Sequence, residues 1–331
     1  MIFHPAILAL YASSVLISFM VLYSAFYGVQ ILKGWDIESG SERQLILERK
    51  TYLISTLLTY LLGFELLSLF LYVFTADQLH TFFVGAMCAA GTLYVNGYGY
   101  PALLLKVANF LLAGLWLILN YTDNQGYDYP LIKKKYALLL FLGPLILAEA
   151  FLQANYFLRL KPEIITSCCG SLFSKGTDTL SSEISFLPIR PMEAIFYLFM
   201  TATLLSGITY YWKGQGGYLF SSLSGATFLV SMASILSFIS VYLYELPTHH
   251  CPFCLLQGEY GYIGYPLYLS LLGGTVSGMG VGVLMPFRKI RSLSNVTPSV
   301  QKRLALFSVI LFLLFTVIVT YKIIFSNFTM E

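Results

Sequence analysis

The chain has 331 residues, of which 57% are hydrophobic and only 11% are charged, and its formal net charge is +3. Soluble globular domains have about a quarter of their residues charged, so this composition excludes a soluble fold and indicates a polytopic membrane protein. The small net charge gives no support for a nucleic-acid partner, because in a membrane protein the positions of Lys and Arg matter more than their sum.

Apolar runs long enough to cross about 30 Å of hydrocarbon, roughly 20 helical residues at 1.5 Å each, recur along the whole chain. They predict eight transmembrane helices, at residues 5–32, 51–75, 101–121, 136–158, 192–212, 218–246, 264–287 and 304–325. We therefore expect an all-α, polytopic integral membrane protein that forms a single transmembrane domain over residues 1–331. In the seventh run, Gly274, Gly278 and Gly282 form a small-residue stripe that predicts close helix packing.

A further apolar segment, residues 82–100, is short and ends in helix-breaking residues. Lys and Arg concentrate in cytoplasmic loops. In this chain they fall mainly in the connectors after the first, third, fifth and seventh runs: Lys33, Arg43, Arg49, Lys50, Lys133, Lys134, Lys135, Lys213, Arg288, Lys289, Arg291, Lys302 and Arg303. These connectors share one side of the membrane only if residues 82–100 do not cross it. We therefore predict that this segment is re-entrant or interfacial.

The same topology places both termini and all five cysteines on the outer side of the membrane, which we expect to be a bacterial cytoplasmic membrane. The absence of Lys and Arg from residues 1–32 agrees with an outward-facing amino end. Two outer loops follow from this topology, a polar loop at residues 161–190 and a Cys-rich loop at residues 247–263. Disulfides persist in such an oxidising compartment, so we expect thiol chemistry there.

The Cys-rich loop contains the motif HHCPFC, residues 249–254, which is the strongest chemical signal in the chain. Two cysteines separated by two residues, Cys251 and Cys254, suit reversible disulfide exchange or a soft metal. His250 directly precedes the first cysteine and can lower the pKa of its thiol. A structural disulfide that tightens the loop is the plainer alternative.

A second pair, Cys168 and Cys169, lies in the polar outer loop. Adjacent cysteines rarely bridge each other, because the bridge strains the intervening peptide. The pair therefore suits thiol exchange with another protein or a metal. Permanent bridges from either residue to one of the other three cysteines are the alternative.

Soft-metal ligands also gather on the predicted outer side: His80, Met87, Cys88 and His249. Copper(I) prefers sulfur ligands, and imidazole suits several transition metals, so a copper site is an alternative to thiol redox chemistry. Zinc would need ligands beyond the crowded HHCPFC motif. Haem held by His80 with His249 or His250 is a further alternative.

Two acidic residues, Glu65 and Glu149, fall near the middle of predicted spans. An ionisable group is costly there and marks a proton path, an ion path or a cofactor contact, so we interpret both residues as candidate quinone contacts. Lys106 lies near the end of its span, and we expect its ammonium group to extend to the membrane surface.

The Cys251-Pro-Phe-Cys254 motif, together with the second cysteine pair, is similar in logic to the membrane disulfide-generating enzymes of the bacterial DsbB and vitamin K epoxide reductase families. The similarity is limited to these features. In those families, cysteine pairs on the outer face pass electrons to a quinone. The similarity therefore implies a quinone-linked thiol oxidoreductase.

The first hypothesis is a membrane thiol-disulfide oxidoreductase in which Cys251 and Cys254 form the active pair. In this hypothesis Cys168 and Cys169 exchange with a periplasmic thiol protein, and a quinone accepts or donates the electrons. A copper transporter or copper-handling protein is the second hypothesis. The third is a structural or electron-transfer subunit of a membrane respiratory complex, with the other respiratory subunits as partners.

Overall fold

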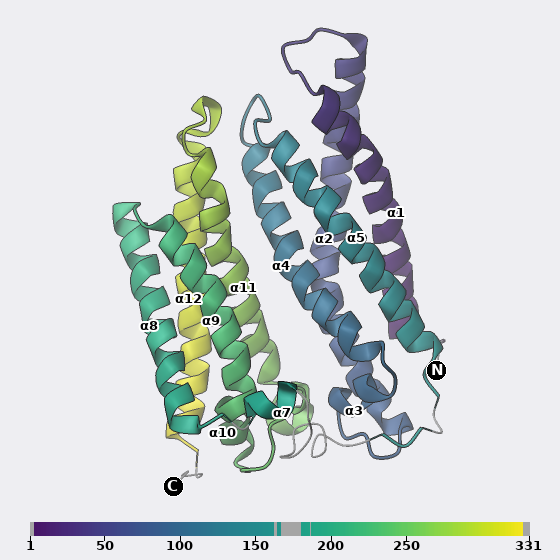
Figure 1. The fold of residues 1–331 in the computed structure, drawn as a ribbon, viewed down its shortest axis with the longest axis vertical. Helices are drawn as coiled ribbons and strands as arrows, with labels where there is room; N and C mark the ends of the chain where they lie inside the picture. Colours follow the sequence, from purple (N-terminus) through teal and green to yellow (C-terminus); the bar gives the residue numbers. More distant parts are fainter. Residues whose placement is uncertain (1–2, 162–163, 167–179, 186, 327–331) are drawn as a thin grey trace. The chain divides into compact units, whose positions relative to one another are not determined.

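The computed structural model of the chain describes residues 3–161, 164–166, 180–185 and 187–326. Within these residues the regular structure is entirely helical, as the apolar runs predict (Figure 1). In the described part of the chain, eight helices are long and apolar enough to span a membrane, which confirms the predicted number and is compatible with an integral membrane protein in a lipid bilayer. The candidate spans are Pro5–Gly34, Glu42–Phe82, Gly99–Asp123, Ile132–Leu158, Ile189–Lys213, Gly217–Tyr244, Gly264–Phe287 and Val296–Ile324.

The second span begins earlier than its apolar run. Helix α2 (Glu42–Gln78) begins at Glu42 instead of residue 51, because the intervening residues are mostly Glu, Arg, Gln, Leu and Lys, which have high helix propensity. The Ser41 hydroxyl oxygen accepts a hydrogen bond of 3.3 Å from the Gln44 N–H, as an N-terminal capping residue does. Apolar length alone therefore underestimates this helix.

The chain divides into two compact units. Unit 1 comprises Met1–Thr75, Asn96–Leu160 and Pro286–Val300, and unit 2 comprises Ala76–Val95, Lys161–Met285 and Gln301–Glu331. The long helices of unit 1 are α1 (Pro5–Gly34), most of α2, α4 (Gly99–Asp123) and α5 (Ile132–Leu158). Unit 2 contains α3 (Ala89–Tyr94), α7 (Leu180–Ser185), α8 (Ile189–Lys213), α9 (Gly217–Ser234), α10 (Ser240–Tyr244), α11 (Gly264–Leu284) and most of α12 (Val296–Ile324). That residues 1–331 form a single transmembrane domain remains a prediction.

Unit 1 is built around large buried side chains of α4 and α5. Trp116 and Tyr136 have no exposed surface, and the Trp116 indole N–H donates a hydrogen bond of 3.0 Å to the Lys135 carbonyl oxygen. Helix α5 packs against α1 as well as α4. Gly28 permits the close approach of α1, since a Cβ atom at this position would lie 3.2 Å from the Tyr136 ring. Leu58 of α2 belongs to the same core, so the four helices form one bundle.

Unit 2 depends on the glycine stripe of α11. A Cβ atom at Gly278 would lie 2.6 Å from the Ser224 Cβ on α9 and 2.9 Å from the Ser308 hydroxyl on α12. A Cβ atom at Gly282 would lie 2.4 Å from the Ser221 Cβ on α9. The α11 backbone thus approaches its neighbours more closely than a larger residue would allow, which confirms the predicted packing role of the stripe.

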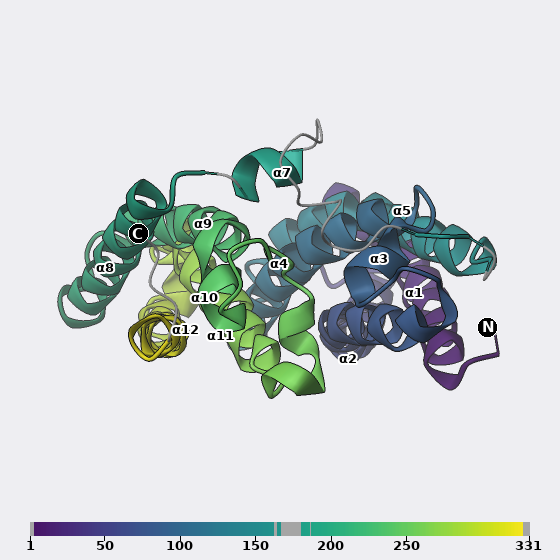
Figure 2. The same ribbon diagram turned by 90° about the horizontal axis from the view of Figure 1, so that it is seen from below.

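Residues 82–100 do not form a spanning helix. They contain the end of a 3-10 turn (Leu79–Phe82), the short helix α3 and the start of α4. The six residues of α3 extend over about 9 Å, far less than the thickness of a bilayer core. Figure 2 draws α3 as a short helix, in contrast to the long α1, α2, α4 and α5. The predicted topology requires this segment not to cross, and its assignment as re-entrant or interfacial remains a prediction.

Two helix connections of unit 1, each flanked by helix ends that carry Lys or Arg, lie at one end of its bundle. Trp35, which follows α1, lines the same cavity as Asn124 and Tyr129, which lie between α4 and α5. The α1–α2 and α4–α5 connections are therefore neighbours, as the distribution of Lys and Arg requires. The side of a membrane that they face remains a prediction.

We predict that Gly278→Ala destabilises the protein by about 1–3 kcal/mol, because the added methyl group overpacks the α9–α11 contact. Gly225→Ala on α9 is the matched control, since its Cβ atom would lie 3.9 Å from the nearest atom, the Met279 sulfur. Thermal unfolding of the purified protein in detergent measures both effects. Equal melting temperatures for the two variants would contradict the packing role of the stripe.

Candidate functional site

Three cysteine thiols from two distant stretches of the chain meet in unit 2. Cys88 directly precedes α3, whereas Cys251 and Cys254 lie in the connection between α10 and α11. Their sulfur atoms all lie within 4.8 Å of one another, and the Cys88 and Cys251 Sγ atoms are 3.5 Å apart. Cys88 and Cys251 have no exposed surface, and Cys254 is 3% exposed. We call this group the thiol cluster, and no disulfide joins its members.

Close backbone packing positions the loop that carries Cys88. Gly85 has a φ of +88°, and a Cβ atom at this position would lie 2.2 Å from the Thr166 carbonyl oxygen, so only glycine fits. The Thr166 N–H donates a hydrogen bond of 3.0 Å to the Val84 carbonyl oxygen. Its hydroxyl donates one of 2.8 Å to the Gly91 carbonyl oxygen. Thr166 therefore holds the chain on both sides of Cys88.

Two tyrosines hold the loop that carries Cys251 and Cys254. The Tyr244 hydroxyl donates a hydrogen bond of 2.6 Å to the Cys251 carbonyl oxygen. The Tyr268 hydroxyl donates one of 2.6 Å to the Pro252 carbonyl oxygen. Tyr244 is the last residue of α10 and Tyr268 lies in the first turns of α11, so both flanking helices anchor this loop.

The carboxylate of Asp77 links the two loops. Its Oδ1 atom accepts hydrogen bonds from the Ala89 N–H at 3.1 Å and from the Gln257 amide at 3.0 Å. The same Gln257 amide nitrogen donates to the Met87 carbonyl oxygen at 3.0 Å. Asp77 and Gln257 together keep Cys88 beside the second loop.

His249 lies next to the thiol cluster. Its ring packs edge-on against the Tyr244 ring, with 4.3 Å between the centroids, and it interacts electrostatically with Cys88. Burial lowers the pKa of His249, and the nearby Cys88 opposes this effect only in part. Its imidazole is therefore neutral at pH 7. The Nε2 atom is buried and has no hydrogen-bond partner among the residues that the structure describes.

The other predicted ligands occupy different positions. The His250 Nδ1 atom lies 2.9 Å from the Leu236 carbonyl oxygen, on the helix that leads into α10. The His80 Nδ1 atom contacts a main-chain carbonyl oxygen one turn earlier in the chain. The Met87 side chain is 64% exposed. His249 interacts electrostatically with Cys88, whereas the ring contacts described for His250 and His80 are to main-chain carbonyl oxygen atoms.

Cys168 and Cys169 lie outside the described residues, so their relation to the thiol cluster remains a prediction. Four residues that no sequence motif marks help to hold the thiol cluster: Asp77, Tyr244, Gln257 and Tyr268. No motif marks these residues, because each acts through a partner that is remote in the sequence or through a main-chain carbonyl group.

A second group of ionisable side chains is buried between α2, α4 and α5 of unit 1. The Lys106 Nζ and Glu149 Oε1 atoms are 2.5 Å apart, and the Asn109 amide donates a hydrogen bond of 2.5 Å to Glu149 Oε2. Glu65 lies within side-chain hydrogen-bonding range of Glu149. The expectation that Lys106 extends to the membrane surface is wrong, because Glu149 provides a partner inside the bundle. Quinone contact by Glu65 and Glu149 remains a prediction.

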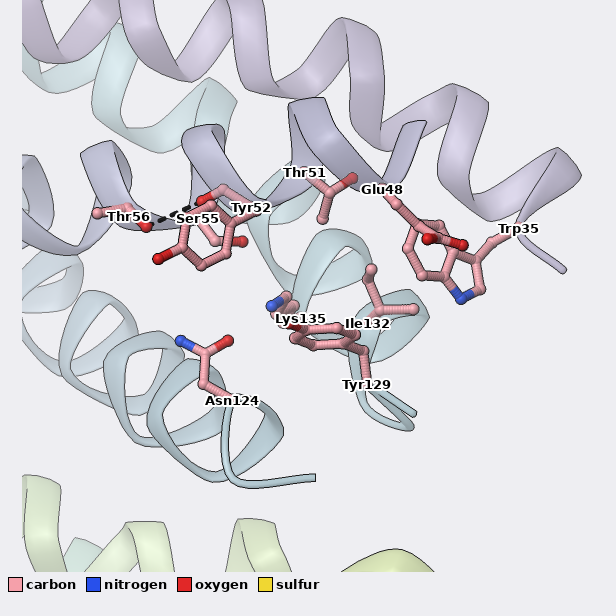
Figure 3. Close-up of a pocket in the computed structure, with 10 residues that line it drawn as sticks. All are labelled: Trp35, Glu48, Thr51, Tyr52, Ser55, Thr56, Asn124, Tyr129, Ile132 and Lys135. Carbon is pink, nitrogen blue, oxygen red and sulfur yellow. Dashed lines mark hydrogen bonds between the residues drawn. The ribbon is translucent and has the colours of Figure 1, made fainter. Parts of the chain in front are cut away.

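A small cavity lies at the basic end of unit 1 (Figure 3). Its volume is about 30 Å³, and its lining includes Thr51, Ser55 and Lys135. The Lys135 Nζ atom lies 2.7 Å from Asp123 Oδ2. This lysine is therefore buried in an ion pair, although the sequence predicts it in a solvent-exposed connector. Cofactor pockets are usually at least about 300 Å³, and this cavity has room for about one water molecule. It is not a candidate cofactor site.

Comparisons with protein-family models, with curated proteins and with solved structures find no match for this chain. The thiol cluster is the strongest candidate site, because it brings three potential nucleophiles or soft-metal ligands together beside a neutral imidazole.

We predict that Gln257→Ala increases the rate at which N-ethylmaleimide alkylates the thiol cluster in the folded protein by several-fold. The substitution removes the hydrogen bonds that connect the two cysteine loops, so local opening becomes easier. Mass spectrometry of the peptides that contain the three cysteines measures the rate. Glu259→Gln, at an exposed position two residues away, is the control. Equal rates in the wild type and both variants would contradict the linking role of Gln257.

Proposed function

We propose that the protein is a membrane thiol-disulfide oxidoreductase and that the thiol cluster is its redox centre. One observation carries this proposal: the Sγ atoms of Cys88, Cys251 and Cys254 lie within 4.8 Å of one another. A pair of thiols suffices for a structural disulfide. A third thiol within reach permits a disulfide to move from one pair to another, which is the elementary step of a redox relay.

In the proposed reaction, a membrane quinone oxidises Cys251 and Cys254. One S–S bond forms, and the two electrons and two protons that leave the thiols convert the quinone to a quinol. In the exchange step, the Cys88 thiolate attacks the Cys251 sulfur. The Cys88–Cys251 bond then forms as the Cys251–Cys254 bond breaks, and Cys254 leaves as a thiolate.

His249 has a defined role in this proposal. Thiol exchange requires a thiolate, and complete burial in apolar surroundings disfavours this charged form for Cys88. The neutral His249 imidazole interacts electrostatically with Cys88, and in this proposal it accepts the Cys88 proton when the two groups come into hydrogen-bond contact. His249 is therefore proposed as the base that activates Cys88, in place of the role that the sequence analysis assigns to His250.

The burial of the thiol cluster restricts its partners. A folded protein cannot reach thiols with no exposed surface, whereas a small membrane-soluble quinone can approach between helices. Exchange with a periplasmic thiol protein would need a carrier, and Cys168 and Cys169 are proposed for this role. The location of these loops on the outer side of a bacterial cytoplasmic membrane belongs to the same proposal.

Quinone treatment of a Cys168→Ser/Cys169→Ser protein tests the proposal, because only the three cluster cysteines remain. A short-chain quinone is added to the purified protein in detergent, the remaining thiols are alkylated after denaturation, and the disulfides are mapped by mass spectrometry. We expect the loss of two of the three thiols. The additional change Cys88→Ser should leave a Cys251–Cys254 disulfide, and Cys254→Ser a Cys88–Cys251 disulfide. Three unchanged thiols after quinone treatment would reject the redox function.

A soft-metal site is the second candidate function, and the three cysteine sulfur atoms, which lie within 4.8 Å of one another, support it. The His249 imidazole is not part of this group of closely spaced ligand atoms. Copper(I) prefers such sulfur-rich sites, and zinc accepts three cysteines and one histidine. This candidate corresponds to a copper-handling protein.

Metal analysis of the reduced protein separates the two candidates. A metal site predicts about one copper(I) or zinc ion per chain, because the cluster offers a single set of ligands. Cys251→Ser should abolish this binding, and His249→Gln should weaken it by about 10-fold or more if the imidazole is a ligand. Protein that binds neither ion but loses two thiols to a quinone would exclude the metal site.

A further inference from the structure

One group of buried ionisable residues in unit 1 contains two acidic side chains but only one basic side chain. Glu65 of α2, Lys106 of α4 and Glu149 of α5 are 5%, 2% and 2% exposed. Two carboxyl groups therefore share one ammonium group inside the bundle. If both carboxyl groups were ionised, the group would carry a net negative charge in an interior that solvates charge poorly.

The contacts show how closely these groups are coupled. The Lys106 Nζ atom lies 2.5 Å from Glu149 Oε1 and 3.0 Å from the Ser68 hydroxyl oxygen. Glu65 lies within side-chain hydrogen-bonding range of Glu149 and of Ser68, and it interacts electrostatically with Lys106. Two carboxyl groups can form a hydrogen bond with each other only when one of them carries a proton.

A second ion pair in the same bundle provides a comparison. Asp123 and Lys135 are also buried, and their charged atoms are 2.7 Å apart. The Asp123 Oδ1 atom also accepts a hydrogen bond of 2.7 Å from the Leu131 N–H. Here one carboxylate matches one ammonium group, so the charges balance without a bound proton. The group around Lys106 differs by the one additional carboxyl group of Glu65.

An unpartnered acceptor supplies independent evidence. Asn109 has no exposed surface, and its amide NH₂ group donates to Glu149 Oε2. The Oδ1 atom of the same amide is buried and has no hydrogen-bond partner among the described residues. A buried acceptor of this kind usually has a donor. The group around Lys106 therefore includes a buried acceptor whose donor is missing among the described residues.

We propose that Glu65 and Glu149 hold one proton between them and that, with Lys106 and Asn109, they form a proton-binding site inside unit 1. Lys106 lies seven residues after the first residue of α4, about 10 Å along the helix. The inference does not depend on the chemistry of the thiol cluster.

Infrared spectroscopy of the purified protein in H₂O and D₂O tests the inference. A protonated carboxyl group has a C=O stretching band that shifts on deuteration, and a carboxylate lacks it. We expect this band in the wild type and its loss in Glu65→Gln and in Glu149→Gln, because Lys106 then pairs with the one remaining carboxylate. Both substitutions keep the shape of the side chain. Lys106→Met should have the opposite effect and increase the band about twofold, since both carboxyl groups must then be neutral.

Asp123→Asn is the matched control, because it removes a buried carboxyl group that has its own lysine. The band should be unchanged in this variant. The inference is overturned if the wild type has no deuteration-sensitive carboxyl band, if the band persists in both glutamine variants, or if Asp123→Asn removes it. A folded Lys106→Met protein without an increase would also overturn it. If Lys106→Met does not fold, the two glutamine variants decide.

Discussion

Polar groups that are buried between apolar helices must find their partners inside the protein, because the apolar surroundings cannot form hydrogen bonds with them. In unit 1 this constraint brings Lys106 to Glu149 and Lys135 to Asp123. In unit 2 it directs the Asp77 carboxylate to a main-chain N–H and a side-chain amide on the two cysteine loops. The need of buried polar groups for partners inside the protein therefore also helps to assemble the candidate site.

The thiol cluster combines rigid support with reactive groups. Tyr244 and Tyr268 donate hydrogen bonds to carbonyl oxygens of the loop that carries Cys251 and Cys254, and Thr166 holds the chain around Cys88. All of these contacts involve the backbone of the loops and not the cysteine sulfur atoms. A redox centre and a soft-metal site both need thiols that are held at close range, and for this reason the geometry supports both candidates. Their distinction depends on chemistry with a quinone or a metal.

Much of the helical architecture could be predicted from the sequence, since apolar length is a local property. The glycine stripe of α11 was also readable, because its four-residue spacing places Gly274, Gly278 and Gly282 on one helix face. The predicted position of the Lys106 side chain is wrong. A long basic side chain near a helix end can either extend to the membrane surface or be buried beside an acidic residue. The choice depends on whether a neighbouring helix presents a carboxylate, and the spacing between Lys106 and Glu149 in the sequence does not reveal this.

The sequence by itself determined that the protein is helical, that eight helices are long and apolar enough to span a membrane, and that Cys251 and Cys254 form a candidate reactive pair. The tertiary structure decided that Cys88 completes the cluster and that His249 interacts electrostatically with Cys88. The physical reason is the range of the interactions involved. Helix formation follows from neighbouring residues, whereas a thiol cluster requires loops that are more than 160 residues apart to meet, and the contact between Cys88 and Cys251 spans 163 residues.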